Sequence, residues 1–351
     1  MNRRHIRAII AALVPALFAN CDHSSPIEPA YYAPAGPLIP GLEAKLALTG
    51  GDVSWTSDGT AILYAGGCLQ REATSDMFGA PSINLLPASG GSAIWEMCES
   101  KNSLKRPPDS LESFGSPALN AHGELLYREC TWPNIDPVIN CGNLGHITIW
   151  LADSSRPWGQ RRLLYDLYHV VLGTPPDPRT RLNDLRELRW IGPATFLARG
   201  YNVNPTSGDS MLGLVIGSTA SPHPTLSVLP GTDQIQAFAL AGNNAVIVFF
   251  RTALEIEQMP IDGGAATKVA DLPGAPGRAL VDISCTGTSC LLLTTEPESG
   301  SAFWRLDLRS SALSLIRMDT AGITLARRSP TSAAVLVRRM DGYYLYSDVP
   351  W

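Results

Sequence analysis

A short apolar strand, a tight polar turn and a second apolar strand recur six times along the chain. In the first copy, VSWTSDGTAILYA, the turn Ser57-Asp58-Gly59 joins two stretches of alternating apolar and small or polar residues. This alternation is typical of β-strands, and no segment shows a convincing helical period. The other five turns fall at Ala121-His122-Gly123, at Gly192-Pro193, at Gly242-Asn243, between Cys285 and Cys290, and near Pro330. The sequence therefore predicts an all-β fold made of one repeated unit.

The strands around these hairpins predict how the repeats are arranged. Each of the first five hairpins is followed by two more strands, whereas the sixth is followed only by GYYLYSD at 342–348. One strand is missing at this end, and one, EAKLALT at 43–49, is spare before the first hairpin. We expect strand 43–49 to be the outer edge of the last blade and to close a six-bladed β-propeller of four-stranded blades, because closure removes exposed sheet edges. An irregular seven-bladed ring and a β-sandwich are the alternatives.

The first repeat carries the most specific motif. Leu48-Thr49 ends one strand, and Trp55-Thr56-Ser57-Asp58-Gly59 follows as a hairpin. The turns Asp262-Gly263-Gly264 and Ser89-Gly90-Gly91 join outer strands. This pattern resembles the TolB-like family of six-bladed propellers, with its PD40 or WD40-like repeats. The resemblance covers residues 43–348 as a repeat pattern and implies protein binding without identifying a partner.

The first twenty residues are typical of an export signal. Three arginines precede an apolar run at 8–18, which is too short to span a bilayer as a helix. Cys21 follows directly, and Leu17-Phe18-Ala19-Asn20-Cys21 resembles a bacterial lipobox, in which the cysteine is lipidated and becomes the new N-terminus. Phe18 and Asn20 differ from the residues usual in that motif. The alternative is cleavage nearby by signal peptidase, with Cys21 incidental.

Residues 21–42 separate this anchor from the propeller at 43–351. The segment DHSSPIEPAYYAPAGPLIPGL holds five prolines and almost no periodicity, as in an extended, semi-rigid tether. An ordered arm that packs on the domain through Tyr31 and Tyr32 is the alternative. With the signal and lipobox, the tether predicts a lipoprotein held on the periplasmic side of a membrane.

Six further cysteines support an extracytoplasmic location. The segments CTGTSC and CTWPNIDPVINC bring Cys285 next to Cys290 and Cys130 next to Cys141, which leaves Cys68 for Cys98. No histidine lies near them at metal-ligand spacing, so a zinc site is not expected. Three local disulfides predict an oxidising compartment.

Few segments of the chain point to catalysis. The net charge of −5 argues against nucleic-acid binding, and the chain has no Gly-x-Ser-x-Gly elbow or glycine-rich phosphate loop. His122 and His146 have no Asp or Ser at diagnostic spacing, and Glu255 and Glu257 share one face of a strand. Asp282 and Glu187 are the candidates for a carboxylate set in the central channel. We expect no enzyme activity, no cofactor and no metal; a propeller enzyme, or a carbohydrate- or small-ligand-binding module that uses the channel, is the alternative.

Long connections gather on one face of the predicted propeller. They join second to third strands and one blade to the next within blades 1–3, at 66–81, 99–115, 130–144, 166–185 and 200–209. Long loops are disproportionately functional, although drift in a tolerant fold is the alternative.

Two of these loops supply the candidate partner-binding residues. In the first, a predicted disulfide and two prolines stiffen the segment that presents Trp132 and Ile135, and a rigid aromatic anchor is the usual form of an interface hot spot. The second loop carries Tyr168, His169, Arg179 and Arg181. The alternatives are that Trp132 folds back over its own blade and that the second loop is a solvated connection.

Together these features predict a non-enzymatic scaffold in the envelope. It would dock through the long-loop face of blades 1–3 onto another envelope or membrane protein. An accessory subunit of a transport, respiratory or photosynthetic complex would suit the lipid anchor and tether.

Overall fold

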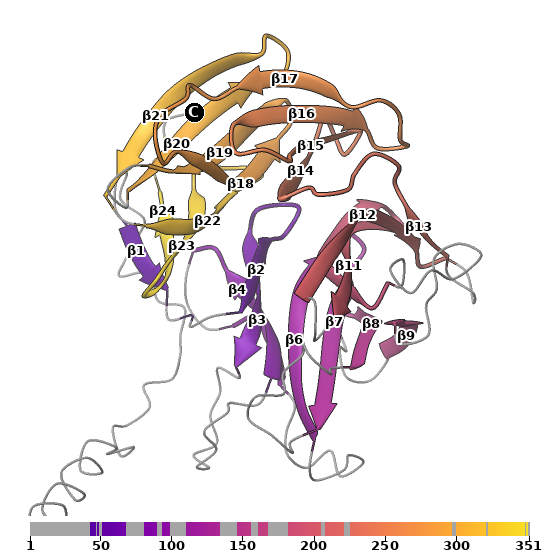
Figure 1. Cartoon of the computed structure of the whole chain (residues 1–351). Coiled ribbons are helices and arrows are strands. Elements are labelled where there is room, and N and C mark those ends of the chain that lie inside the picture. Colours follow the sequence, from indigo (N-terminus) through magenta and orange to yellow (C-terminus); the bar gives the residue numbers. More distant parts are fainter. Residues whose placement is uncertain are drawn as a thin grey trace, which may run out of the picture.

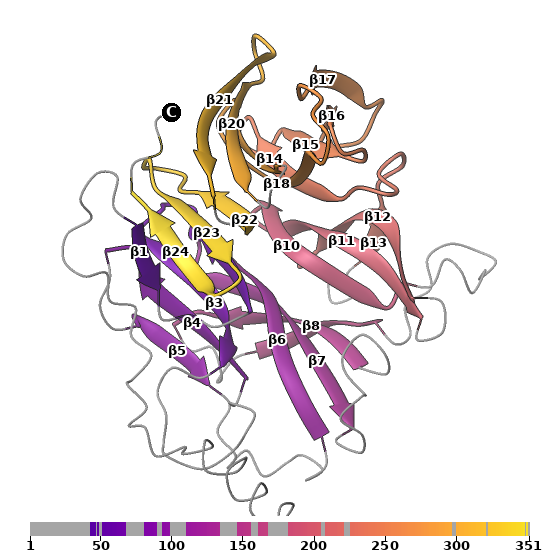
Figure 2. The same ribbon diagram turned by 60° about the vertical axis from the view of Figure 1, so that its left-hand side comes forward.

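The chain folds into six four-stranded antiparallel sheets arranged in a ring (Figure 1). The computed structural model describes residues 43–46, 48, 51–67, 81–89, 93–98, 110–133, 146–155, 161–167, 182–204, 208–220, 225–296, 300–320, 322–347 and 349. In Figures 1 and 2 the colours follow the ring from indigo through magenta and orange to yellow, so the first and last parts of the domain lie side by side. The prediction of an all-β, six-bladed propeller is confirmed, and the seven-bladed ring and the β-sandwich are wrong.

Each blade begins with the hairpin that the sequence predicted, and two further strands follow outward. Blades 1 to 3 consist of the following strands: β2 (Asp52–Trp55), β3 (Ala61–Gly67), β4 (Pro81–Pro87) and β5 (Trp95–Cys98); β6 (Ser110–Leu119), β7 (Glu124–Pro133), β8 (His146–Asp153) and β9 (Arg161–Asp166); β10 (Asp184–Gly192), β11 (Thr195–Asn204), β12 (Gly208–Ser218) and β13 (Leu226–Val228). Only three residues form β13, so blade 3 has the shortest outer strand of these three.

Blades 4 to 6 repeat this arrangement. Their strands are β14 (Ala237–Ala241), β15 (Val246–Phe250), β16 (Glu255–Pro260) and β17 (Thr267–Asp271); β18 (Ala279–Thr286), β19 (Ser289–Thr295), β20 (Ser301–Asp307) and β21 (Ala312–Asp319); β22 (Ile323–Arg328), β23 (Val335–Arg339) and β24 (Gly342–Tyr346). The strand β1 (Glu43–Leu46) pairs antiparallel with β24, in the register Glu43 with Tyr346 and Leu46 with Tyr343. Leu46 and Leu48 are buried there beside Tyr343.

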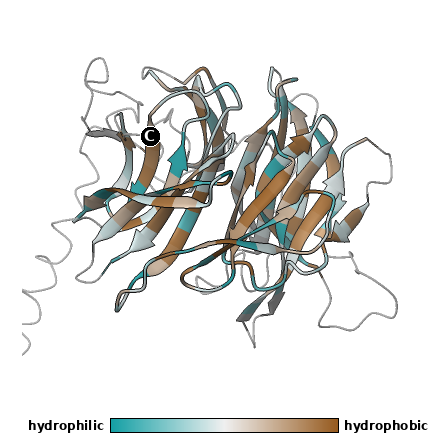
Figure 3. Cartoon of the chain, turned by 90° about the horizontal axis from the view of Figure 1, so that it is seen from above, coloured by the Kyte–Doolittle hydropathy of each residue, from teal (hydrophilic) through white to brown (hydrophobic). Residues whose placement is uncertain are grey.

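The hydrophobic core is divided among the seams between neighbouring blades. The described residues form six apolar clusters, and each joins residues of two adjacent blades. Large aromatic side chains such as Phe196, Phe303 and Tyr346 are fully buried in them. Figure 3 shows the hydrophobic residues along the strands and hydrophilic residues in many of the turns. Burial of this kind, worth about 1.5–3 kcal/mol for each large side chain, holds each sheet against the next.

Hydrogen bonds join every pair of neighbouring blades as well. The indole Nε1 of Trp55 donates to Arg327 O across the seam of blades 1 and 6, and Trp190 Nε1 donates to Ala118 O across that of blades 2 and 3. The remaining seams carry Ser54 Oγ to Pro117 O, Asn244 Nδ2 to Trp190 O, Gly242 N to Gly287 O, and Arg328 N to Ser284 Oγ. A buried donor without an acceptor costs free energy, so these bonds favour one alignment of each blade on the next.

One predicted disulfide lies wholly within the described residues. Cys285 and Cys290 are directly opposite each other at the end of the β18–β19 hairpin and are bonded, with Cα atoms 4.0 Å apart. Cys130, buried in β7, is also disulfide-bonded, but its predicted partner Cys141 lies outside the described residues. Cys68 lies outside them too, and only the backbone of Cys98 is described. The predicted signal segment 1–20, Cys21 and the tether 22–42 are likewise outside them.

Candidate functional site

The innermost strands of several blades bend where polar side chains enter the central channel. Register shifts interrupt β6 between Gly115 and Ala118, and β10 between Arg186 and Arg189. Within these two bulges Ser116 and Glu187 have positive φ angles, 50° and 55°, which are uncommon for residues with a side chain. Strained backbone of this kind is retained where the surrounding structure holds it in place, and it concentrates at functional sites.

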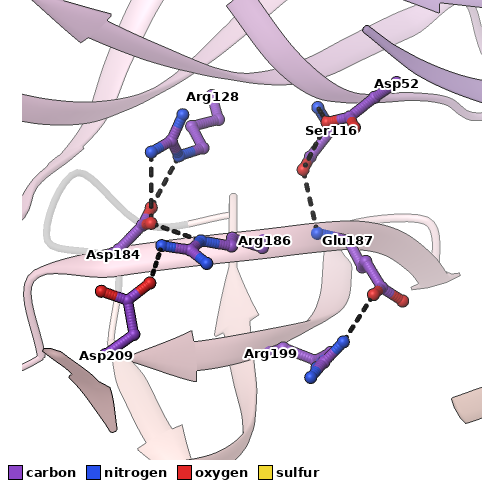
Figure 4. A network of polar contacts seen from close by, with 8 residues as sticks. All are labelled: Asp52, Ser116, Arg128, Asp184, Arg186, Glu187, Arg199 and Asp209. Carbon is purple, nitrogen blue, oxygen red and sulfur yellow. Dashed lines mark hydrogen bonds and ion pairs between the residues drawn. The ribbon is translucent and has the colours of Figure 1, made fainter. Parts of the chain in front are cut away.

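A relay of hydrogen bonds holds the two bulges (Figure 4). The backbone N–H of Ser116 donates to Asp52 Oδ2 at 2.6 Å, and Ser116 Oγ accepts the N–H of Glu187 at 2.9 Å. Blades 1, 2 and 3 are therefore joined at the channel through Asp52, Ser116 and Glu187. The bulges point N–H groups of the channel strands towards neighbouring blades, where side-chain oxygens accept them.

The Glu187 carboxylate continues this relay across the channel. Its Oε1 accepts from Arg199 Nη1 at 2.8 Å, and its Oε2 lies 3.9 Å from Arg327 Nη2. Because Arg327 belongs to blade 6 and Glu187 to blade 3, which are opposite in a ring of six, this contact spans the channel. Arg327 Nη1 also donates to Asp282 Oδ1 of blade 5 at 2.5 Å, and Asp282 Oδ2 accepts the N–H of Ala326.

Burial and neighbouring charges act in opposite directions on the two acids. Burial disfavours the Glu187 carboxylate, but Arg327, Arg199 and Arg189 outweigh it, so the pKa of Glu187 lies below its ordinary value of 4.5. Burial dominates for Asp282, whose pKa is raised in spite of its contact with Arg327. At neutral pH both carboxyl groups serve as partners of arginines, because each is held by at least one charged donor.

A second charged chain lies at the blade 2–blade 3 seam, where the long connections begin and end. Arg128 Nε and Nη2 donate to the two oxygens of Asp184 at 2.6 and 3.2 Å, and Arg186 Nε donates to Asp184 Oδ2 at 2.7 Å (Figure 4). Arg186 Nη2 also reaches Asp209 Oδ2 at 2.7 Å, and its guanidinium stacks on Tyr201 at 4.4 Å. The Asp184 side chain is only 1% exposed, so its two cations are required to stabilise it there.

Two channel residues named from the sequence lie close to the same arginine. Asp282 and Glu187 converge on Arg327 rather than on each other. Within the described part of the chain, no three His, Cys, Asp or Glu side chains are grouped so as to hold a metal ion. The pattern of acids alone did not reveal that an arginine lies between them.

The other titratable candidates have separate partners. His122 is exposed in the β6–β7 turn, whereas His146 Nε2 lies 2.6 Å from Asp166 Oδ1 on the surface of blade 2. Glu257 pairs with Arg251 at 2.5 Å, and Glu255 lies 4.0 Å from Lys268. These contacts place the two glutamates in separate ion pairs.

The candidate partner-binding residues fall largely outside the described residues. Ile135, Tyr168, His169, Arg179 and Arg181 are all outside them. The backbone of Trp132 lies in β7 and pairs with Leu111, and its side chain is not described. The strands on either side of these loops are described and include the Arg128–Asp184–Arg186–Asp209 chain.

Sequence reasoning missed Asp52, Ser116, Arg189, Arg199 and Arg327. One signal was present, since Asp52-Val53-Ser54-Trp55 and Asp282-Ile283-Ser284-Cys285 occupy the same place in their hairpins. Both serines form hydrogen bonds to the next blade. An Asp-apolar-Ser triplet therefore marks the channel strands of blades 1 and 5, and the other four innermost strands lack it.

Glu187→Gln is expected to lower the free energy of unfolding at pH 7 by about 1–2 kcal/mol, because it replaces a charge-assisted contact with a neutral one. The folded-state pKa of Glu187 is lowered, so its contribution is present above about pH 4.5 and is lost as pH falls through the folded-state value. Thermal unfolding from pH 7 to pH 3 should show the difference from wild type shrinking below about pH 4.5. The control is Glu255→Gln, on an outer strand of blade 4. A gap that stays constant down to pH 3 would contradict this account.

Comparison with known proteins gives structural similarity only. No family model matches the chain, and no curated protein matches it in sequence. The β-propeller domain of Cps50 (Swd1) from Myceliophteria thermophila is 9% identical with a TM-score of 0.48, over 90% of this chain and 98% of that one. TolB from Acinetobacter baumannii is 12% identical with a TM-score of 0.43, over 76% of this chain and 55% of that one. The RRP9 WD40 repeats are 12% identical with a TM-score of 0.43, over 90% of this chain and 98% of that one.

At identities this low, the comparisons concern the fold alone and carry no information about function. Among the residues placed by the structure, no helix has the length and hydropathy needed to cross a membrane. The fold itself rests on the strand order of the six sheets. By that order the chain is a six-bladed β-propeller, similar at low identity to TolB and to WD40 propellers.

Proposed function

We propose that this protein is a non-enzymatic scaffold on the extracytoplasmic side of a bacterial membrane. In this role it is an accessory subunit of a membrane-associated complex and docks on another envelope protein. The docking surface is the long-loop face of blades 1–3, with Trp132 and Ile135 as apolar anchors and Tyr168, His169, Arg179 and Arg181 as a second patch. Lipidation at Cys21 and the tether 21–42 hold the propeller at the membrane.

The observation that carries this proposal is the charged chain at the strand ends of blades 2 and 3. In an antiparallel blade, the starts of the first and third strands lie at the same face as the ends of the second and fourth. Asp184 begins β10 and Asp209 lies at the start of β12, so both are at the face from which the connections 130–144, 166–185 and 200–209 leave. Their ion pairs with Arg186 and Arg128 fix the strand ends. A loop mounted on a fixed base loses less entropy when it binds.

The channel geometry also favours a structural role over catalysis. The acids that a channel enzyme would use are engaged by Arg199 and Arg327, and the Glu187–Arg327 contact spans the channel. A general acid or base must reach its substrate, and each of these carboxylates already has a charged partner. We therefore propose a binding function without catalysis.

Two finer features belong to the same proposal. The chain is a divergent member of the TolB-like propellers, as the Leu48-Thr49 turn and the Trp55-Thr56-Ser57-Asp58-Gly59 hairpin indicate. Strand 43–49 closes the ring as the outer strand of blade 6. The register of β1 on β24 and the burial of Leu46 support this closure.

The test is capture of the tagged protein from its native membranes in mild detergent. Trp132→Ala should reduce recovery of the proposed partner by roughly tenfold or more, the effect of removing an aromatic hot spot. The matched control is Met340→Ala, because Met340 is 97% exposed in the β23–β24 turn on blade 6. Loss of the partner in both variants, or in neither, would contradict docking through blades 1–3.

A further inference from the structure

Arg189, an arginine of the channel, has no hydrogen-bond or ion-pair partner among the residues that the structure describes. Arg189 lies at the end of the β10 bulge, and its half-buried side chain forms no hydrogen bond or ion pair with any described residue within contact distance. The neighbouring arginines differ, since Arg199 reaches Glu187 and Arg327 reaches Asp282. A guanidinium has five N–H donors and no acceptor, so the N–H groups of Arg189 can donate hydrogen bonds to a ligand.

The nearby acids are engaged elsewhere. Asp52 accepts from Ser116, Asp282 accepts from Arg327 and from the N–H of Ala326, and Glu187 Oε1 accepts from Arg199. They attract Arg189 through space but do not form a contact ion pair with it. Burial, with repulsion from Arg327, lowers the pKa of Arg189 to about 10, so the side chain is still charged at neutral pH.

The donors around Arg189 outnumber the free acceptors. Arg199 Nε and Arg327 Nε are both buried without a hydrogen-bond partner, and Glu187 Oε2 is the one channel carboxylate oxygen in that condition among the described residues. Arg189 and Arg327 come from blades 3 and 6, on opposite sides of the channel. The two guanidiniums repel each other, and an anion between two like charges of this kind stabilises both.

We propose that Arg189 is the centre of an anion-binding site in the channel, beside the Glu187–Arg327 contact. The ligand class is a small oxyanion, a phosphate or a carboxylate, because a guanidinium forms two parallel hydrogen bonds with either group. The side chains that meet across the channel, with Glu187 Oε2 and Arg327 Nη2 3.9 Å apart, restrict the site to a small ligand. This site is separate from the loop face proposed for docking and does not depend on it.

The test is titration of the purified protein with inorganic phosphate and with succinate. Calorimetry measures binding, and thermal unfolding measures stabilisation, each compared with chloride at the same ionic strength. Wild type should be stabilised by at least one of the two anions, and the stronger one identifies whether the site prefers a phosphate or a carboxylate. Arg189→Gln should weaken that binding by roughly tenfold or more, as expected for loss of hydrogen bonds to a charged group. Arg305→Gln is the matched control, since Arg305 is half-buried on β20 in blade 5 and away from the channel cluster.

A second readout separates binding from a structural role. Because Arg189 has no ion-pair partner in the described part of the chain and burial disfavours its charge, Arg189→Gln should unfold at the wild-type temperature or above it in chloride alone. Absence of stabilisation of wild type by either anion would overturn the proposal. So would equal binding by wild type and Arg189→Gln, or a variant that is destabilised in chloride alone.

Discussion

Arg327→Met is expected to lower the free energy of unfolding by about 3–5 kcal/mol, the cost of leaving a buried charge without its partner. Arg327 is 10% exposed and Asp282 6% exposed, and they are in direct contact between blades 5 and 6. The same substitution also removes the Glu187 contact across the channel. Methionine keeps an apolar stem of similar length, so the loss reports on charge more than on packing. Urea denaturation at pH 7 measures it.

A double-mutant cycle isolates the ion pair. Asp282→Leu combined with Arg327→Met should be more stable than Arg327→Met alone, because two apolar side chains can pack where one unpaired charge cannot. The control is Arg338→Met, since Arg338 is exposed, stacks over Tyr343 at 5.8 Å and forms no ion pair with any residue that the structure describes. If the double variant is no more stable than Arg327→Met, the cost of the single change lies elsewhere than in Asp282.

Removal of residues 43–49 is expected to destabilise the domain by about 5 kcal/mol or more. Leu46 and Leu48 are each 1% exposed in the core between blades 6 and 1, and deletion of a buried leucine side chain typically costs about 2–5 kcal/mol. The deletion also removes the strand partner of β24, and an unpaired sheet edge promotes association between chains. Thermal unfolding and size-exclusion chromatography measure the two effects.

A second deletion provides the control. A protein that lacks 22–42 but keeps 43–49 should unfold at the wild-type temperature, because it retains Leu46 and Leu48, which are buried in the domain. If the two deletions behave alike, strand 43–49 does not close the ring.

The hairpins could be predicted because their signals are local. Alternation at period two and a Gly, Asn, Asp or Pro turn occur within about fifteen residues, and all six predicted turns join paired strands. The Cys285–Cys290 disulfide is local in the same sense. The residues that determine each hairpin and this disulfide therefore all lie within a short window of the sequence.

The channel network could not be predicted, because it depends on bulges and on distant partners. Alternation assigns Ser116 and Glu187 to a face, and a register shift then changes which way each residue points. Glu187 meets Arg327 only once six blades have formed a ring, and the segment LARRS around Arg327 has the composition of an exposed strand end. The Asp-apolar-Ser triplets at Asp52 and Asp282 are visible in the sequence, but which distant residues they meet is set only by the closed ring.

The seam between blades 1 and 6 has a consequence for the order of folding. Its bonds join Trp55 to Arg327 and Gly51 to Tyr343, which are 272 and 292 residues apart, whereas side-chain bonds across four other seams join residues 44 to 72 apart. The residues joined at this seam are about four times further apart in the sequence, and closing the longer loop costs roughly 1 kcal/mol more in conformational entropy. The five local seams can form one after another as an open arc, while the sixth waits for the final strands. We therefore expect ring closure to be the last step of folding, and this seam to open first when the folded protein unfolds locally.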